Sequence, residues 1–471
     1  MMETCGDNCE CKTGDGLFTY PDTFREEFCR TSGLKFEDGR KVSAAEIWRY
    51  MTVEAPARFP YKFVDGRSCE VISHDASFFS GVKRNYLGFT SWDRMTEKIL
   101  NGRPAVSIQF GHPNELYRAV GCEPVGPGFG RMWLWRKVEG QGMKESEQRM
   151  YDLMEEYRKS LPAESCNLIA SYPATCNEEV PLSFRAPCTV MRCSDIVYAM
   201  ESCRDDRKLP THIVDYPVNH YPGEWRIEYL SKQLRNLAVE LGKLSGKDVT
   251  DDVLFAEIKK YNRLRKLGME CQRMWWSAKV PPTTSEDNFF SGVGAGGMGD
   301  VTAATQLMEG ARDELTFRIK NGIKGLDVAD NAPRVLICGS CACIHCSAIR
   351  DAGGVEVAHD DNLSLASLRV KETGDPYYNL AEGLSSLPYE LPPEERAEWT
   401  AKMVRESRAD GVIFVYNWGC NYQSSVSRLV TDIIREHTGV PTTCIEVGEL
   451  GRMQGSEQLR NRVEAFMEMI S

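Results

Sequence analysis

The C-terminal part of the chain alternates short, continuous apolar runs with longer amphipathic stretches. The run Val-Ile-Phe-Val at 412–415 is typical of a strand buried on both faces, and the stretch at 424–437 repeats its apolar positions with helical spacing. The same alternation predicts strands at 334–337, 355–357, 412–415 and 443–446 and helices at 347–352, 394–408, 424–437 and 456–470. Strands that alternate with helices indicate a domain built around a parallel sheet.

A similar alternation lies earlier in the chain, between residues 104 and 215. Here the pattern predicts strands at 105–110, 124–125, 188–191 and 212–215 and helices at 113–121 and 195–204. The two blocks share this order of elements without recognisable sequence repetition. We therefore expect an α/β protein with two doubly wound parallel-sheet domains of the flavodoxin-like or Rossmann-like kind.

The segments outside these blocks have other patterns. Residues 225–276 carry long helical periods that break at Gly246-Lys247 and start again behind Thr250, a residue type that often caps helices. Residues 1–90 read as irregular, with one helical stretch at 44–51. The expected organisation is an N-terminal extension at 1–90, a first α/β domain at 91–224, a helical segment at 225–330 and a second α/β domain at 331–471.

Composition limits the classes of function. At 471 residues, of which 42% are hydrophobic, the chain is long enough for several folded cores, and a net charge of −11 argues against nucleic acid as a partner. Its apolar runs are too short to span a membrane and its polar first residues do not resemble a secretory leader, so we expect a cytoplasmic protein without a membrane partner. In that reducing compartment, 18 cysteines indicate metal, cluster or redox chemistry rather than disulfides.

Three cysteines stand where such chemistry is expected. Cys420 follows the run at 412–415 and a glycine, Cys193 follows the expected strand at 188–191, and Cys166 lies in a loop upstream, where Cys176 competes with it. A residue at the carboxyl end of a parallel strand faces the crevice in which open α/β sheets bind ligands. Soft thiolates in such positions suit an iron–sulfur cluster, although an isolated cysteine is more often a small buried apolar residue.

A second group of thiols follows the expected strand at 334–337. Cys338, Cys341, Cys343 and Cys346 have the spacing C-x-x-C-x-C-x-x-C, which is typical of zinc or iron–sulfur sites. The alternative is a helix start that tolerates thiols. Both interpretations stay open at the level of the sequence.

Two other patterns have mainly structural interpretations. Gly294-Ala295-Gly296-Gly297-Met298-Gly299 fits the dinucleotide fingerprint G-x-G-x-x-G, but no strand precedes it, so nucleotide binding is disfavoured. A glycine-rich loop that opens a helix at Val301 can still cradle an anionic group. We expect Trp133, Trp135, Trp225, Trp275 and Trp276 to pack in the core or between domains rather than to form a stacking platform.

Several short motifs, in order and spacing, resemble the 2-hydroxyacyl-CoA dehydratase and benzoyl-CoA reductase family, of the 2-hydroxyglutaryl-CoA dehydratase D-component type. They run from about residue 104 to the C-terminus. The marks are Pro113-Asn114-Glu115-Leu116, Cys193-Ser194-Asp195, Leu209-Pro210-Thr211-His212, Asn262-Arg263, Cys420, Gly439-Val440-Pro441 and Glu457-Gln458-Leu459-Arg460.

The resemblance implies a chemistry and a set of site residues. Cys166, Cys193 and Cys420 would ligate a [4Fe–4S] cluster whose fourth iron is open to an acyl-CoA substrate. A paralogous or identical dehydratase subunit and an ATP-dependent iron–sulfur activator protein would be the partners. The activator's electron would form a ketyl radical anion of the 2-hydroxyacyl thioester, which loses its hydroxyl group. Glu115 is the candidate acid or base, although a carboxylate also suits the first turn of a helix.

Three functional hypotheses therefore remain. The leading one is a lyase subunit that dehydrates a 2-hydroxyacyl-CoA, or a low-potential reductase of an aryl-CoA. The second is a reductase of small substrates with a double-cubane [8Fe–9S] cluster, for which the thiols of 338–346 would supply additional ligands. The third is a noncatalytic subunit that relays electrons or completes a dimer.

Overall fold

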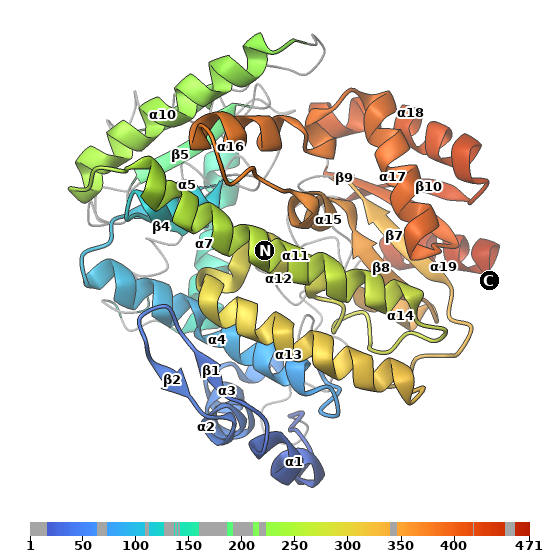
Figure 1. Cartoon of the computed structure of the whole chain (residues 1–471). Coiled ribbons are helices and arrows are strands. Elements are labelled where there is room, and N and C mark those ends of the chain that lie inside the picture. The colour runs from blue at the N-terminus through green and yellow to red at the C-terminus, as the bar shows by residue number, and fades with distance from the viewer. Residues whose placement is uncertain are drawn as a thin grey trace.

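Two parallel β-sheets organise the chain in the computed structural model (Figure 1). The structure describes residues 17–63, 73–108, 113–126, 136, 139, 142–159, 186–191, 211–215, 223–339, 346–417, 419–447 and 457–471. The first sheet contains β3 (Ala105–Ser107), β4 (Glu123–Val125), β5 (Ala186–Met191) and β6 (His212–Asp215). The second contains β7 (Arg334–Cys338), β8 (Val355–His359), β9 (Gly411–Asn417) and β10 (Thr442–Val447). All eight strands were expected from the sequence, with ends that differ by a few residues.

Both sheets use the same strand order. The first runs β4-β3-β5-β6 and the second β10-β9-β7-β8, and every pairing within them is parallel. In each sheet, the strand that comes first along the chain lies between the second and the third, and the fourth lies beside the third. The chain is therefore a mixed α/β protein with parallel sheets, as the alternating pattern predicts.

Helices cover both faces of the second sheet. Val335, Ile337 and Ile413 pack on one face with α19 (Glu457–Ile470), and α14 (Cys346–Asp351) lies against α19. Leu336 and Phe414 point to the opposite face, into the larger core. That core includes residues of α15 (Asp360–Ser367), α17 (Pro393–Ser407) and α18 (Asn421–Thr438). Because both faces are buried, the strands read as continuous apolar runs rather than as alternating patterns.

Long helices connect the two sheets. These connecting helices are α10 (Trp225–Ser245), α11 (Asp251–Ser277), α12 (Phe290–Gly296) and α13 (Val301–Lys320). The predicted break between α10 and α11 is confirmed: α10 ends at Gly246, whose φ is +69°, and the Thr250 side chain accepts a hydrogen bond from the Val253 N–H at the start of α11. With 27 residues, α11 is about 40 Å long. It contacts both α5 (Asn114–Ala119) near the first sheet and α17 at the second (Figure 1).

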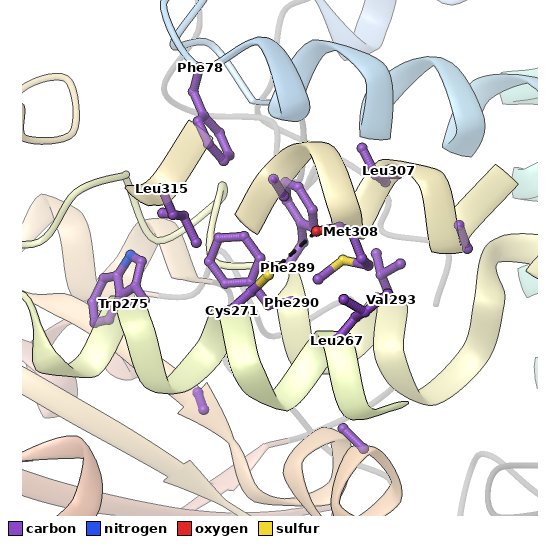
Figure 2. Close-up of a cluster of buried hydrophobic side chains, with 14 of the residues drawn as sticks. Phe78, Leu267, Cys271, Trp275, Phe289, Phe290, Val293, Leu307, Met308 and Leu315 are labelled. Atoms are coloured by element: carbon purple, nitrogen blue, oxygen red, sulfur yellow. Dashed lines mark hydrogen bonds between the residues drawn. The ribbon is translucent and has the colours of Figure 1, made fainter. Parts of the chain in front are cut away.

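The same large core continues to the place where α11, α12 and α13 meet (Figure 2). Trp275 and Cys271 of α11 are buried there beside Phe290, and the Cys271 thiol donates a hydrogen bond to the Met308 carbonyl at 3.6 Å. Burial raises the pKa of Cys271 to about 12, so this cysteine is a structural residue. Trp276 is buried as expected, and Trp133 and Trp135 lie outside the described residues. Trp225 is 52% exposed, so its assignment to the core is wrong; it begins α10 away from the stripe of buried leucines on that helix.

The N-terminal part contains more helix than its sequence indicates. The expected helix at 44–51 is present as α2 (Ala44–Arg49). Its N-terminus is capped by Ser43 and Glu46, which form a capping box. The long helix α4 (Phe79–Leu100) was not expected. Its first two N–H groups donate to the Glu314 carboxylate at 2.7 and 2.9 Å. This cap comes from α13, more than 230 residues away, and therefore leaves no local signal.

The remaining elements belong neither to the two parallel sheets nor to the long connecting helices. They are α1 (Arg25–Cys29), β1 (Leu34–Lys35), β2 (Lys41–Val42), α3 (Ala55–Arg58), α7 (Met143–Arg158) and α16 (Pro376–Ser385), with a π-helical segment at Tyr50–Glu54 and 3₁₀ turns at Asp22–Phe24, Pro60–Lys62, Gly297–Gly299 and Pro388–Glu390. Among the helices of the described segments, none carries an apolar stretch long enough to cross a bilayer.

Candidate functional site

Cys420 lies at the carboxyl edge of the second sheet. Strand β9 ends at Asn417, and the Cys420 N–H donates to the Asn417 carbonyl at 3.0 Å, which closes a tight turn. Gly419 takes the third position of this turn with a φ of +78°, a value that strongly favours glycine. Cys420 then forms the N-cap of α18 and is partly exposed. Gly419 thus serves the turn, and Cys420 stands at a helix N-terminus, which favours negative charge.

The other two expected ligands lie outside the described residues. The structure describes β5 up to Met191, two residues before Cys193, and no part of 160–185, the segment that contains Cys166 and Cys176. Across the described ranges, histidine, cysteine and acidic side chains form no group of three or more that could hold a metal ion. A site built from Cys166, Cys193 and Cys420 therefore remains a prediction.

Cys338 ends β7 with its side chain in the core. It is fully buried in the same apolar cluster as Leu336 and Phe414. Burial, and then the nearby Asp360 carboxylate, raise the pKa of the Cys338 thiol well above its ordinary value. A neutral thiol in apolar surroundings is a poor metal ligand. Of its neighbours, Cys341 and Cys343 lie outside the described residues and Cys346 begins α14.

The backbone after β7 is fixed against β9. Gly339 has a φ of +121°, and a Cβ atom at this position would lie 1.9 Å from the Val415 carbonyl oxygen. The Gly339 N–H donates to the Asp360 Oδ1 at 3.1 Å. Only glycine fits this approach, because any side chain would overlap the neighbouring strand.

A buried chain of polar side chains runs along the same edge. Arg396 of α17 donates to the Asp360 Oδ2 at 3.1 Å and to the Gln423 Oε1 at 2.8 Å. Asp360 follows β8 directly, and Gln423 lies in the first turn of α18, three residues after Cys420. Arg396 therefore connects Asp360, which follows β8, to Gln423, which follows β9. Asp360 extends the connection to Gly339, which follows β7. Sequence analysis missed this chain, since its members are separated by 36 and 27 positions.

Glu115 is held at a different place in the fold. It lies in the first turn of α5, fully buried, and Arg265 of α11 donates to its two carboxylate oxygens at 2.8 and 3.1 Å. Such a two-point pairing with an arginine fixes the orientation of the carboxylate. The structure thus shows a role for Glu115 in joining the first sheet region to α11. An acid or base role toward substrate remains a prediction.

The glycine-rich segment does not offer an anion site. Gly294–Gly296 ends helix α12, so the segment follows a helix rather than a strand. The Asp300 carboxylate caps α13, accepting hydrogen bonds from the Ala303 N–H at 2.9 Å and the Glu37 N–H at 3.1 Å. The expectation that this helix N-terminus can cradle an anion is wrong, because a carboxylate already occupies the position and repels another negative charge.

Comparison with known proteins identifies the family. The model of the family described as 2-hydroxyglutaryl-CoA dehydratase, D-component, matches residues 109–470. The chain belongs to this dehydratase family. It is also 30% identical over 274 residues to one of the subunits of the benzoyl-CoA reductase of Thauera aromatica, a match that covers 54% of this chain and 66% of that protein. The resemblance drawn from the sequence motifs is thereby confirmed.

The region matched to the dehydratase family contains the candidate site. Glu115, Cys166, Cys193 and Cys420 all lie between residues 109 and 470, as do the buried chain members Asp360, Arg396 and Gln423. Helix α4 and everything before it precede the match. These N-terminal elements nevertheless join the matched region, since Glu314 of α13 caps α4.

Proposed function

We propose that this chain is the iron–sulfur subunit of a 2-hydroxyacyl-CoA dehydratase-type enzyme, with Cys166, Cys193 and Cys420 as ligands of a [4Fe–4S] cluster. The observation that carries the proposal is the position of Cys420. It combines a strand end, a turn that strongly favours glycine and a helix N-terminus, within a chain that belongs to the dehydratase family.

Among the three proposed ligands, Cys420 is the one that the structure describes, and its setting suits such a cluster. Cys420 is partly exposed at the edge where parallel sheets bind ligands, whereas Cys338 and Cys271 are buried in apolar surroundings with raised thiol pKa values. When bound, an iron–sulfur cluster supplies one-electron chemistry at low potential, which an acyl thioester needs before its weakly acidic C3–H can be removed. The chain itself contributes a cysteine whose backbone is fixed by its turn and, along the same edge, the buried side chains of Asp360, Arg396 and Gln423.

The proposal extends to the domains, the substrate and the partners. We expect residues 91–224 and 331–471 to form two flavodoxin-like, doubly wound domains, each built on one of the sheets, with 225–330 between them. The substrate is a 2-hydroxyacyl-CoA, and the enzyme is completed by a paralogous or identical subunit. An ATP-dependent activator protein delivers the electron, and the cytoplasm is the expected location.

Reduction of an aryl-CoA is the second candidate function. The similarity to a benzoyl-CoA reductase subunit favours it, and the same three cysteines would serve. A double-cubane cluster ranks lower because Cys338, one of the additional thiols it would draw on, is buried in the core. A noncatalytic electron-relay subunit is the remaining alternative, which an activity assay distinguishes.

The function is tested by assaying the anaerobically purified enzyme with its co-purifying subunits, reductant, ATP and activator. Formation of an enoyl-CoA from 2-hydroxyglutaryl-CoA, followed by mass spectrometry, supports the dehydratase, and consumption of benzoyl-CoA supports the reductase. Cys420→Ser should abolish either activity. Cys444→Ser is the matched control, because this thiol lies within β10 of the same sheet. Absence of both reactions contradicts a catalytic role.

A further inference from the structure

Gln423 carries a buried hydrogen-bond donor that has no acceptor among the described residues. The side chain is 1% exposed, and its Oε1 accepts a hydrogen bond from Arg396 at 2.8 Å. Its Nε2 is buried and meets no partner in the described part of the chain. A buried amide N–H without an acceptor has given up its hydrogen bonds to water without replacement, so such a group calls for an explanation.

The orientation of this amide is fixed by its neighbours. Arg396 presents only donors, so the carbonyl oxygen of Gln423 must face it and the NH₂ group must face elsewhere. Arg396 is itself held by the Asp360 carboxylate at 3.1 Å. Exchanging the amide oxygen and nitrogen would set donor against donor, which rules out the flipped form.

The amide lies in the same helical turn as Cys420. Cys420 is the N-cap of α18 and Gln423 is its third residue, and residues three apart lie on one side of a helix. The spacing is that of a capping box, in which the side chain at the third position reaches back toward the N-cap. Here the N-cap residue is a thiol, and the side chain at the third position offers an N–H donor.

We propose that Gln423 is a positioning residue whose amide N–H donates a hydrogen bond to a sulfide of the cluster that Cys420 ligates. The inference rests on the proposed function, since it requires sulfur ligated to iron at this position. Hydrogen bonds to cluster sulfurs stabilise the reduced, more negative state and raise the reduction potential. Asp360 and Arg396 serve to hold the donor in place.

The test is the midpoint potential of the cluster, measured by an EPR-monitored redox titration of the anaerobically purified protein. Gln423→Met removes the donor, and Gln423→Glu removes it while keeping an acceptor for Arg396. Both variants should have a lower potential than the parent at the same iron content. Ser424→Glu is the control, because it adds the charge of a glutamate at an exposed position of the same turn.

The outcomes separate this inference from the proposed function. If the parent chain contains no iron, the proposed function fails and the inference fails with it. If the parent holds a cluster, and folded Gln423→Met and Gln423→Glu proteins keep both the iron and the parent potential, only the role of Gln423 is overturned. A lower potential in Gln423→Met, absent from Ser424→Glu, supports the donor because no charge has changed in the former.

Discussion

The Arg265 guanidinium binds both oxygens of the Glu115 carboxylate, at 2.8 and 3.1 Å, and both side chains are almost completely shielded from solvent. The pair joins α5, beside the first sheet, to α11, which also contacts α17 at the second sheet. The connection between α5 and the long helix therefore depends in part on one buried ion pair, whatever role Glu115 has toward substrate.

Replacing Glu115 by alanine should lower the free energy of unfolding by about 3–5 kcal/mol, because it leaves the Arg265 charge buried without a partner. Chemical denaturation monitored by circular dichroism measures this loss. The double variant Glu115→Ala/Arg265→Met should recover part of it, since the orphaned charge is then gone. Equal stability of the single variant and the parent would contradict a structural role.

Glu115→Gln separates packing from catalysis. An amide keeps the shape and one acceptor for Arg265, so the loss of stability should be smaller than in the alanine variant. If Glu115 also acts as an acid or base, kcat falls in a protein that remains folded. An unchanged kcat in folded Glu115→Gln would leave Glu115 with its structural role alone.

Gly339→Ala should destabilise the protein by roughly 2–4 kcal/mol, since the new methyl group meets the Val415 carbonyl oxygen at 1.9 Å and the backbone has a positive φ. Gly353→Ala is the matched control: its φ is +82°, but no atom lies within 4 Å of the added carbon. It should show only the backbone strain, roughly 1–2 kcal/mol. Equal melting temperatures of the two variants would contradict the close packing of Gly339 against β9.

Asp287 should make the stability depend on pH. Burial, more than any neighbouring group, raises the pKa of this carboxyl from 3.8 to about 8 in the folded protein. Between these values the folded state holds a proton that the unfolded state has released. The free energy of unfolding therefore falls as the pH rises through this window, by on the order of 1 kcal/mol per pH unit, and levels off above pH 8.

Asp287→Asn should remove this dependence, because asparagine resembles the neutral carboxyl and cannot ionise. The variant should gain stability relative to the parent as the pH rises toward 8. Thermal melts of both proteins at a series of pH values measure the difference. Parallel stability profiles would show that Asp287 does not titrate with a raised pKa.

Much of the fold could be predicted from local patterns. The strands β7 and β9 are apolar runs, and the break between α10 and α11 rests on Gly246 and Thr250, residues whose own conformation or side chain sets the boundary. Helix α4 was not predicted, because its cap, Glu314, belongs to a distant helix and because buried polar residues such as Asn85 interrupt its apolar stripe. Local sequence carries no trace of such tertiary contacts.

Of the residues at the candidate site, local sequence likewise indicates some and not others. Cys420 could be selected because strand, glycine and cysteine are adjacent in sequence. Arg396 and Asp360 could not, because an arginine within an amphipathic helix reads as a solvated charge unless its buried partners are known. The spacing of Gln423 from Cys420, which matches a capping box, was the one signal in the sequence that could have drawn attention to this chain of side chains.

The central claim is that Cys420 ligates an iron–sulfur cluster, and the most direct test is the iron and acid-labile sulfide content of the chain after anaerobic purification. The account predicts about four irons and four sulfides per chain, the content of one [4Fe–4S] cluster. In folded Cys420→Ser protein both should be lost, whereas Cys444→Ser should retain them. About eight irons would favour the double-cubane cluster instead, and a folded parent chain without iron would contradict the account.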